Sequence, residues 1–463
     1  MAPRGLQEFL QGYEAQYPGD VVHVEKPIDH RWEIPALLVK LEKLNRFPLA
    51  VFHNVLTRDG TRSPFPLVYN VFADRQRCAR IIGSTVDEYS LEFARRAKEQ
   101  KTAPVVVGKE HAPVKEVIHG AGEFDLTCLP APVHHSYDPG PYLTAGFFTT
   151  VDPDSGVSNS ALHRGWLKER DEIRVYLDYH THNGENLLRH EKLGRDMRAA
   201  YWIGHDPAVC LGTQTPTSYP GSHFDIAGGI IGEPIRLVPS ESLGDDFLVP
   251  ADAEIVIEGL MHPGERQQEG PFGEGWGYTG PMRTNPVLHV TAVTHRTNAY
   301  LHGIMIGHAD QMAGISPIFV EASVAEAVRL AVPNVVRIVR PPWAMTQIYI
   351  VIKKTGEGQA KEALLTALGR SNKVKQAFVF DEDVNVFDPQ EVLWAIGTRL
   401  SMDDGLVVAT KCRSTSLDPF TPDKEYVTKW GMDCTKPLDL NFPERSTIPQ
   451  DVMSRVKLED YVG

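Results

Sequence analysis

The sequence predicts a multidomain α+β protein in which two α/β lobes flank a β-rich middle. The first observation is the length of 463 residues, which exceeds what one hydrophobic core usually supports. The second is the alternation of strand-like and helix-like segments near both ends of the chain. The third is a series of short strand-like runs in between, which favours a barrel or a sandwich. We therefore expect three parts, at residues 1–103, 104–315 and 316–463.

The N-terminal lobe is predicted from the spacing of its apolar residues. Leu6, Phe9, Leu10 and Tyr13 recur at the spacing of one helical face. The same reasoning predicts, in order, a helix at 6–17, a strand at 20–24, a helix at 34–44, a strand at 49–52 and a helix at 86–100.

The middle part is predicted to be a β domain because its apolar runs are short and separated by turn signals. Asp152-Pro-Asp-Ser-Gly156 is one such signal, and 130–141 is a loop rich in Pro, His and Gly. The predicted strands are 105–107, 116–118, 146–151, 174–177, 208–211, 236–238, 254–258 and 287–292.

The C-terminal part returns to alternating helices and strands, which predicts an α/β domain. Its elements are a linker helix at 316–332, a strand at 348–352, a helix at 359–368, a strand at 377–380 and a helix at 389–400. The last forty residues are rich in Pro and Asp, and we expect this tail to need a partner surface.

Composition and charge exclude several classes of protein. Hydrophobic residues make up 42% of the chain and charged residues 23%, as in globular proteins. A formal net charge of -13 argues against a general nucleic-acid binder. The chain shows neither a signal peptide nor 18 uninterrupted apolar residues, and its five cysteines are scattered. We expect a soluble, cytoplasmic protein that binds neither nucleic acid nor membrane.

Two acids, Glu269 and Glu274, flank the segment Gly-Pro-Phe-Gly. This segment suits neither a helix nor a strand interior, since Pro lacks an amide donor and Gly costs backbone entropy. Such a turn lets the backbone approach a ligand closely. Two acids held in a partly apolar loop can take different protonation states, which is the basis of acid–base catalysis. The alternative is a surface turn with two solvated acids.

Three further polar segments stand out in the middle part. They are Asn159-Ser-Ala-Leu-His-Arg164, His180-Thr-His-Asn-Gly184 and Ser222-His-Phe-Asp-Ile-Ala-Gly228. Their spacings match no standard metal motif, and a single His in a β domain is more often a structural hydrogen-bonding residue.

Taken together and in chain order, these segments resemble the UbiD-type family of decarboxylases, which use prenylated flavin mononucleotide. The resemblance includes Asn159 followed by Arg164, His182-x-Gly184, Gly204 to Ala208, Ala227-Gly228, Glu269 to Glu274, Lys375 to Asp383, Leu393-Trp394 with Arg399, and Gly431 to Asp433. It implies a central split β-barrel that binds the flavin. It also implies a C-terminal α/β domain that assembles homodimers or homohexamers.

The resemblance implies a divalent metal, most often manganese, that bridges protein and cofactor phosphate. Asn159 and His182 match two of the family's ligands, while His223 stands where the family has Glu. Imidazole in that place makes zinc, iron or cobalt more competitive, and Asp225 could assist if this segment is a strand. Potassium is a further candidate ion. The cofactor-lining positions implied by the resemblance are Thr144, Asn159, Arg164, Gln214, Thr215, Pro216 and Lys375.

The implied catalytic residues are Arg164, Glu269 and Glu274. Arg164 would keep Glu269 ionised, and Glu274 would protonate the carbon that loses carbon dioxide. The expected reaction is the reversible decarboxylation of an unsaturated, aromatic or heteroaromatic carboxylic acid. A flavin prenyltransferase would supply the cofactor.

The residues after Glu274 and around position 305 are expected to form the substrate pocket. Gly275 would leave room beside the flavin, and Trp276, His302, Met305 or His308 would shape a pocket for a bulky or aromatic acid. The alternatives are a non-catalytic flavin-binding homologue and a metal-dependent hydrolase, either of which would follow if His223 has altered the metal–phosphate site.

Overall fold

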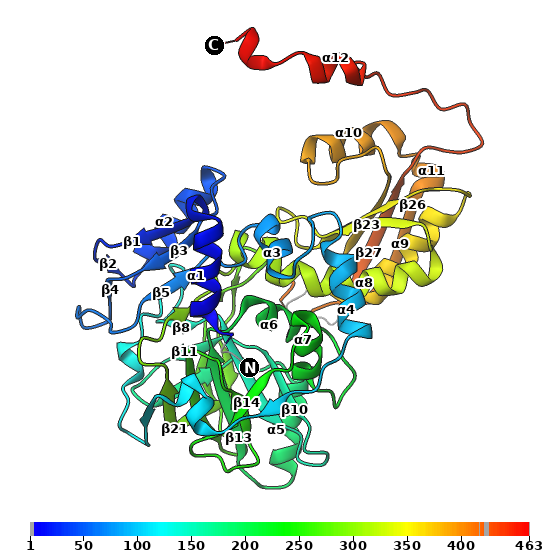
Figure 1. Cartoon of the computed structure of the whole chain (residues 1–463). Coiled ribbons are helices and arrows are strands. Elements are labelled where there is room, and N and C mark those ends of the chain that lie inside the picture. Colours follow the sequence, from blue (N-terminus) through cyan, green and yellow to red (C-terminus); the bar gives the residue numbers. More distant parts are fainter. Residues whose placement is uncertain (1–3, 416, 421–425, 463) are drawn as a thin grey trace.

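The computed structural model describes residues 4–415, 417–420 and 426–462. Figure 1 shows the N-terminal lobe in blue, the β-rich middle in cyan and green, and the C-terminal domain in yellow and orange. This is the α+β, multidomain architecture that the sequence predicts. In the described part of the chain, no helix combines the length and apolar character that a membrane crossing requires.

The N-terminal lobe is built on a small mixed sheet. Its elements are α1 (Leu6–Gln16), β1 (Val21–Val24), β2 (Ile28–Asp29), α2 (Glu33–Lys43), β3 (Leu49–Phe52), β4 (Val55–Leu56), β5 (Leu67–Tyr69), α3 (Arg75–Ile81) and α4 (Tyr89–Glu99). The sheet order is β1-β3-β5-β22, and β22 (Leu301–His302) comes from much later in the chain. The N-terminal lobe is therefore completed by the segment that follows the central domain's strands.

The central domain holds most of the strands. Its elements are β6 (Val105–Val106), β7 (Val117–His119), β8 (Tyr142–Leu143), β9 (Gly146–Val151), β10 (Ser158–Leu162), β11 (Gly165–Leu167), β12 (Glu172–Val175), α5 (His182–Lys192), β13 (Met197–Ile203), α6 (Pro207–Gly212), α7 (His223–Ile231), β14 (Arg236–Pro239), β15 (Leu248–Pro250), β16 (Ile255–Met261), β17 (Gln267–Glu269), β18 (Phe272–Gly273), β19 (Thr279–Gly280), β20 (Arg283–Asn285) and β21 (Val287–His295).

One large antiparallel sheet curls into a half-barrel. Its order is β10-β9-β13-β16-β21-β12-β11-β8, with β7 also paired to β21. Successive side chains of a strand point to opposite faces, so Phe147 and Phe148 of β9 enter two different hydrophobic clusters. Both faces of the sheet are therefore buried, one under α6 and α7 and the other under the N-terminal sheet.

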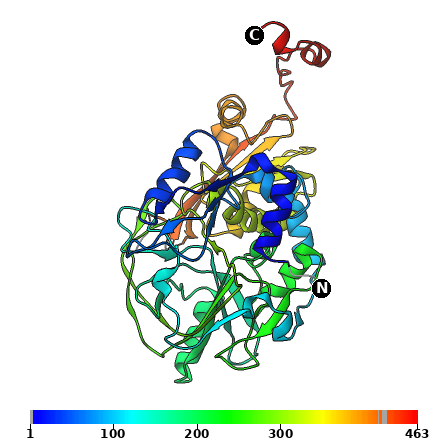
Figure 2. The same ribbon diagram turned by 60° about the vertical axis from the view of Figure 1, so that its left-hand side comes forward.

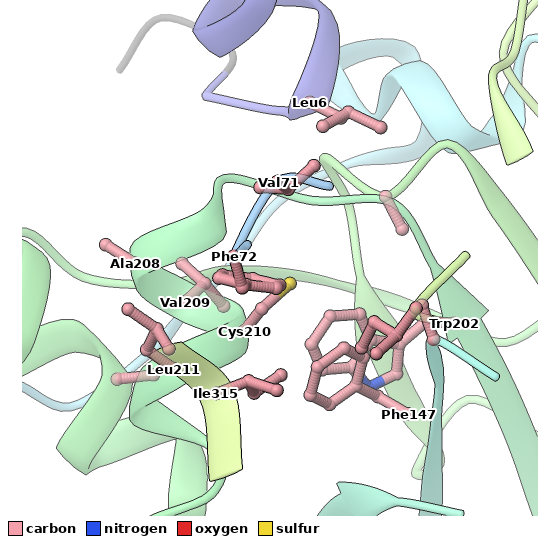
Figure 3. Packing of buried hydrophobic residues seen from close by; sticks show 14 of the residues in the cluster. Leu6, Val71, Phe72, Phe147, Trp202, Ala208, Val209, Cys210, Leu211 and Ile315 are labelled. Carbon is pink, nitrogen blue, oxygen red and sulfur yellow. The ribbon is translucent and has the colours of Figure 1, made fainter. Parts of the chain in front are cut away.

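Trp202 of β13 ties this sheet together from the inside. Its ring stacks on Phe147 with centroids 4.3 Å apart, as Figure 3 shows. Its indole N–H donates to the Ser160 hydroxyl at 2.8 Å, and Ser160 lies on β10 beside Asn159. The packing of Trp202 thus positions the strand that carries a candidate ligand.

We expect Trp202→Ala to lower the free energy of unfolding by about 3–5 kcal/mol, since it leaves a cavity and removes the indole donor from the Ser160 hydroxyl. Urea unfolding followed by circular dichroism measures this loss. Leu393→Ala is the control, because Leu393 is 68% exposed and should cost less than about 0.5 kcal/mol. Equal losses for the two variants would contradict the packing argument.

The C-terminal domain is a sheet with helices on both faces. Its elements are α8 (Ser316–Ala331), β23 (Val335–Val339), β24 (Gln347–Ile352), α9 (Gln359–Arg370), β25 (Gln376–Asp381), α10 (Pro389–Arg399), α11 (Met402–Gly405), β26 (Leu406–Arg413) and β27 (Tyr426–Cys434). The sheet order is β23-β24-β25-β27-β26. Ile348, Ile350 and Ile352 pack with α8 and α9, whereas Tyr349 and Val351 pack in the cluster that includes α10.

Two segments differ from the sequence prediction. Residues 208–211 were expected to form a strand, but they lie in α6. Asp206 caps this helix by accepting a hydrogen bond from the Ala208 amide, and Pro207 occupies its first position. In so short a segment, the helix stabilisation by the Asp206 cap outweighs the strand preference of Val209. The segment from His223 onward, treated as extended in the sequence analysis, is helix α7.

The chain beyond Cys434 stays bound to the C-terminal domain as far as Arg445, which pairs with Glu391 at 2.5 Å, and then leaves it. In both views it carries α12 (Gln450–Arg455) away from the rest of the molecule (Figures 1 and 2). Ile448, Met453 and Leu458 are exposed along it. The last forty residues were expected to form this tail, but Tyr426–Cys434 is strand β27 of the C-terminal sheet. That the remainder needs a partner surface stays a prediction, and residues 424, 425 and 463 lie outside the described part.

Candidate active site

The two acids of the loop end two consecutive short hairpin strands. Glu269 is the last residue of β17, which pairs with β20, and Glu274 directly follows β18, which pairs with β19. Gly270 between them has a φ of +83°, a left-handed conformation that glycine adopts without strain. The turn continues as the Glu274 amide donates to the Tyr278 carbonyl at 2.8 Å. The Gly-Pro-Phe-Gly sequence thus folds both carboxylates toward one place.

Arg164, between β10 and β11, joins the two carboxylates. Its Nε and Nη2 donate to the two oxygens of Glu269, each at 2.9 Å, and its Nη1 donates to Oε1 of Glu274. Its guanidinium also lies over the ring of Phe272, 4.6 Å from the centroid. Burial opposes the positive charge, but the two carboxylates outweigh it and raise the pKa of Arg164 above its usual range. The structure therefore brings the predicted trio together.

Glu269 receives two further hydrogen bonds that the sequence analysis did not predict. The Tyr142 hydroxyl donates to its Oε1 and the Asn285 amide to its Oε2, both at 3.0 Å. Glu269 is fully buried, and these donors together with Arg164 satisfy both of its oxygens. Burial, reinforced by the charge of Glu269, raises the pKa of Tyr142. Tyr142 therefore stays a donor to Glu269.

Glu274 has a different environment. It accepts a hydrogen bond from Arg164 and keeps 13% of its side-chain surface exposed. Of the two acids, it is thus the one that a ligand or solvent can reach. The geometry can hold one anion fixed and leave the other carboxylate free to exchange a proton.

A cavity of about 650 Å³ lies between the central and C-terminal domains. Its walls include Asn159, His182, Gln214, Thr215, Pro216 and His223 from the central domain. Phe319, Leu368, Lys373 and Lys429 contribute from the other side. Six of the sequence-predicted cofactor and metal residues therefore meet in one place.

Unsatisfied polar atoms converge on this cavity. Buried donors and acceptors are almost always hydrogen-bonded, so a group of exceptions calls for an explanation. Among the described residues, the buried atoms without a partner include Asn159 Oδ1, His182 Nδ1, Gln214 Nε2, Thr215 Oγ1 and His223 Nδ1. The Asn159 oxygen and the two histidine nitrogens can ligate a divalent metal. The Gln214 amide and the Thr215 hydroxyl can donate hydrogen bonds to an anion.

The side chains of this group are oriented for coordination. Asn159 Nδ2 donates to Asn183 Oδ1 at 2.6 Å, which turns its own oxygen toward the cavity. Burial lowers the pKa of His182, and burial together with His182 lowers that of His223 to about 4. Both imidazoles are therefore neutral near pH 7, the form that ligates metals.

Asp225 does not accompany His223 as the sequence analysis supposed. Because α7 is a helix, a step of two residues turns the side chain by about 200°, to the opposite side. Asp225 instead accepts from the Ser222 hydroxyl at 3.2 Å in the first helical turn. The expectation depended on an extended backbone and is corrected here.

Two other predicted cofactor residues lie elsewhere. Lys375 pairs with Asp418 at 2.8 Å, and within the described part of the chain it is Lys373, two residues earlier, that lines the cavity. Burial lowers the pKa of Lys373 to about 8. Thr144 accepts a hydrogen bond from the Ile304 amide at 3.0 Å and is buried against the loop that follows β22.

The residues proposed to shape a substrate pocket are dispersed. The place beside Gly275 is filled, because a Cβ there would lie 2.7 Å from the Gln311 side chain. His308 pairs with Glu42 at 2.9 Å. His302 is buried and contacts Phe72, and Trp276 faces Lys375. The expected space next to Gly275 is thus occupied by this chain's own glutamine.

A second cavity, of about 1320 Å³, lies beside the group formed by Arg164, Glu269 and Glu274, and two residues that contact this group are part of its wall. Tyr176, which lies under the Arg164 guanidinium, and Asn285, which donates to Glu269, both line it. In its described wall the three basic residues Arg283, Lys411 and Arg413 outnumber the one acid, Asp178, so the net charge is positive. Such a cavity favours an anionic ligand.

Asp310 anchors the loop after β22 to the N-terminal lobe. Its carboxylate accepts hydrogen bonds from the amides of Asn70 at 3.0 Å and Phe72 at 2.9 Å. Burial outweighs these donors and raises the pKa of Asp310 from 3.8 to about 6. The folded protein therefore binds this proton more tightly than the unfolded chain does.

This difference predicts a pH-dependent stability. Between about pH 4 and 6 the folded state keeps the Asp310 proton that the unfolded chain loses, so stability falls as the pH rises. The loss attributable to Asp310 reaches about 3 kcal/mol. Asp310→Asn lacks this titration, so the stability difference between variant and parent should change by that amount between about pH 4 and 7. Urea unfolding at both pH values measures it, and a constant difference would contradict it.

Comparisons with known proteins cover the whole architecture. Residues 105–309 match the model of the UbiD, 3-octaprenyl-4-hydroxybenzoate carboxy-lyase Rift-related domain. Residues 14–97 match the N-terminal domain of the same carboxy-lyase, and residues 315–434 match its C-terminal domain.

Two relatives that match this chain over most of their length are decarboxylases by name. An anhydromevalonate phosphate decarboxylase of Methanosarcina mazei is 30% identical over 440 residues, covering 94% of this chain and 97% of the relative. A gallate decarboxylase of Lactiplantibacillus plantarum is 29% identical over 395 residues, covering 80% of this chain and 79% of the relative.

The fold is similar to that of a solved flavin enzyme. The UbiD-class enzyme HmfF from Pelotomaculum thermopropionicum, in complex with FMN, has a TM-score of 0.90 and 34% identity, covering 99% of this chain and 100% of its own. An evolved dimeric form of that enzyme in complex with prFMN has a TM-score of 0.88 with the same identity and coverage.

Proposed function

The chain belongs to the UbiD family and is a carboxy-lyase, and from this premise we propose that it decarboxylates an unsaturated, aromatic or heteroaromatic acid, reversibly, with prenylated FMN as its cofactor. The observation that carries the proposal is the group of buried, unpartnered polar atoms around the 650 Å³ cavity. The flavin complexes of HmfF, one with FMN and one with prFMN, support the choice of cofactor.

The donor set of the cavity fits a cofactor phosphate held through a metal. Asn159, His182 and His223 would ligate the divalent ion, and Thr215, Gln214 and Lys373 would donate to the phosphate. Manganese accepts this set, but two imidazoles make zinc, iron and cobalt stronger competitors than they are beside a carboxylate. We assign the lysine role to Lys373 in preference to Lys375, because Lys373 lines the cavity.

Decarboxylation needs a sink for the electron pair that the departing carbon dioxide leaves, and the prenylated flavin supplies that chemistry when bound. The residues of this chain then manage the proton. Glu274, the reachable acid, donates it to the carbon that lost carbon dioxide, and in the reverse direction removes it. Arg164 orients Glu274 and compensates the charge of Glu269. Tyr142 and Asn285 hold Glu269 in place.

The substrate class rests on the second cavity and on the relatives. The wall of the cavity includes Tyr176 and Asn285, which contact Arg164 and Glu269, and it carries more basic than acidic side chains. Such a wall suits a conjugated acid with a second polar or anionic group. The two relatives act, by their names, on a phosphate-bearing acid and on a phenolic acid. A flavin prenyltransferase supplies the cofactor, and the protein works as a homodimer or homohexamer.

The test is to produce the protein together with a flavin prenyltransferase and to analyse the small molecules and metal that it releases. The parent chain should release prenylated FMN and a divalent metal in similar amounts, and should convert acids from an aromatic and acrylic panel. His223→Ala should lose both, since it removes one ligand. Asp225→Asn is the matched control and should keep both.

His223→Glu sharpens the test. The carboxylate that the family resemblance implies at this position should retain flavin binding and shift the bound metal toward manganese. A parent protein without flavin would overturn the proposal. A His223→Ala protein that keeps both flavin and metal would remove His223 from the site.

A further inference from the structure

A second group of metal-ligating side chains lies at the end of the half-barrel sheet. Strands β13, β16 and β21 are neighbours there, with Met197 opposite Met261 and Leu260 opposite His289. Asp196 directly precedes β13 and His262 directly follows β16, so the strand register brings both beside His289. Glu265 follows three residues after His262 in a tight turn.

The distances within this group are close to those of a metal ligand set. One ligand atom from each of His262, Glu265 and His289 lies within 4.8 Å of the others. His289 Nε2 is 2.8 Å from Glu265 Oε2, and the two imidazole rings have centroids 5.0 Å apart. Ligands of one tetrahedral zinc ion, each about 2.0–2.2 Å from it, are separated by about 3.3–3.6 Å. Small side-chain rotations therefore suffice to close the site.

Asp196 supplies the outer contact that zinc-binding histidines usually have. Its Oδ1 accepts from His262 Nδ1 at 2.9 Å. A carboxylate at Nδ1 fixes the ring orientation and leaves Nε2 as the ligating nitrogen, which is the common carboxylate–histidine–zinc arrangement. The ion pairs His262–Asp196 and His289–Glu265 would each explain the position of one histidine. They do not account for both rings and Glu265 facing one common point.

We propose that His262, Glu265 and His289 form a binding site for a divalent transition metal of the zinc class, oriented by Asp196 and separate from the flavin cavity. Two imidazoles and one carboxylate are a ligand set that zinc accepts, with water in the fourth place. All three ligands are partly exposed, so the ion enters directly from solvent.

The site stands at the base of the strand that carries a catalytic acid. The turn at Gly264 is fixed by its amide, which donates to Glu191 at 3.0 Å, and Arg266 pairs with the same carboxylate at 2.7 Å. The chain then enters β17, which ends at Glu269. A metal bound by His262 and Glu265 cross-links both ends of this turn to β21 and so restrains the start of β17.

The test is a zinc titration of chelator-treated protein by calorimetry. The parent chain should bind one zinc ion per chain more than His262→Gln/His289→Gln, which retains every residue of the flavin cavity. His190→Gln is the matched control, since His190 bonds to its own helix at the Asn186 carbonyl. It should bind zinc as the parent does. Asp196→Asn should weaken the site by about 10-fold or more.

Hydrogen exchange provides the second measurement. Zinc should slow amide exchange over 262–269 in the parent and in His190→Gln but not in the double variant. Equal zinc stoichiometry in the parent and the double variant would overturn the proposal. A difference that appears only at millimolar zinc would overturn it as well, because it would show weak surface association. Circular dichroism of the metal-free variants verifies that all share the parent fold.

Discussion

Glu274→Gln is expected to keep the flavin and lose turnover, by about 100- to 10,000-fold. Gln has the shape of Glu and can still accept the hydrogen bond from Arg164, so the loop and the cavity should be unchanged. It cannot donate the proton that the new carbon–hydrogen bond requires. Turnover of the loaded protein with a reactive acid, measured beside the flavin content of the same sample, gives both quantities.

The control for Glu274→Gln is Glu169→Gln, an exposed acid at a turn before β12. It should turn over at the parent rate. Deuterium incorporation from heavy water into the product tests the assignment further, since it should slow with the turnover in Glu274→Gln. Parent-like turnover in Glu274→Gln would exclude Glu274 as the proton donor.

Arg164→Met should remove activity and destabilise the protein by about 3–5 kcal/mol. Met has a similar length but no charge, so the fully buried carboxylate of Glu269 would lose the two hydrogen bonds and the cation that compensate it. Tyr142 and Asn285 remain as donors, but both are neutral. Urea unfolding of the flavin-free proteins separates the stability loss from any effect of cofactor binding.

A double variant distinguishes charge compensation from packing. In Arg164→Met/Glu269→Gln the uncompensated charge is gone, so the protein should regain a large part of the lost stability while remaining inactive. If the two changes were simply additive in stability, the ion pair would not be the source of the loss. Tyr176 and Phe272, which contact the guanidinium, would then carry it.

The family resemblance implied the trio Arg164, Glu269 and Glu274, and the segment between the two acids was distinctive by itself. A Gly-Pro-Phe-Gly segment between two acids is rare in helices and strands, and it folds into the turns that its glycines allow. Tyr142 and Asn285 could not be predicted in the same way. Each is a polar residue in a short strand, and only the pairing of strands distant in sequence brings it to Glu269.

The errors in the cavity have local causes. His223 lies beside His182, but the segment that carries it was treated as a strand and is a helix, so Asp225 points away. Lys373 and Lys375 lie on the same sequence segment before β25, and composition does not separate them. Only the course of the backbone into β25 decides which ammonium enters the cavity.

The N-terminal lobe shows a different limit of sequence reasoning. Its sheet ends with β22, which comes from the residues that precede the linker helix, and β22 pairs in parallel with β5. A two-residue strand carries no periodicity of its own. The pairing of β22 with β5 depends on how the loop anchored by Asp310 packs against the N-terminal lobe. The sequence of β22 alone does not reveal this packing.

One wall of the 650 Å³ cavity carries Asn159 and Gln214, and the opposite wall carries Leu368 and Lys373. Binding of a ligand in this cavity is therefore coupled to the association of the two domains that form the walls. A ligand that touches both walls binds tightly only while they are together, so its binding free energy adds to the work needed to separate them. At 100 times its dissociation constant this amounts to about 2.7 kcal/mol. In the proposed complex, bound cofactor would therefore add to the packing that holds the central and C-terminal domains together.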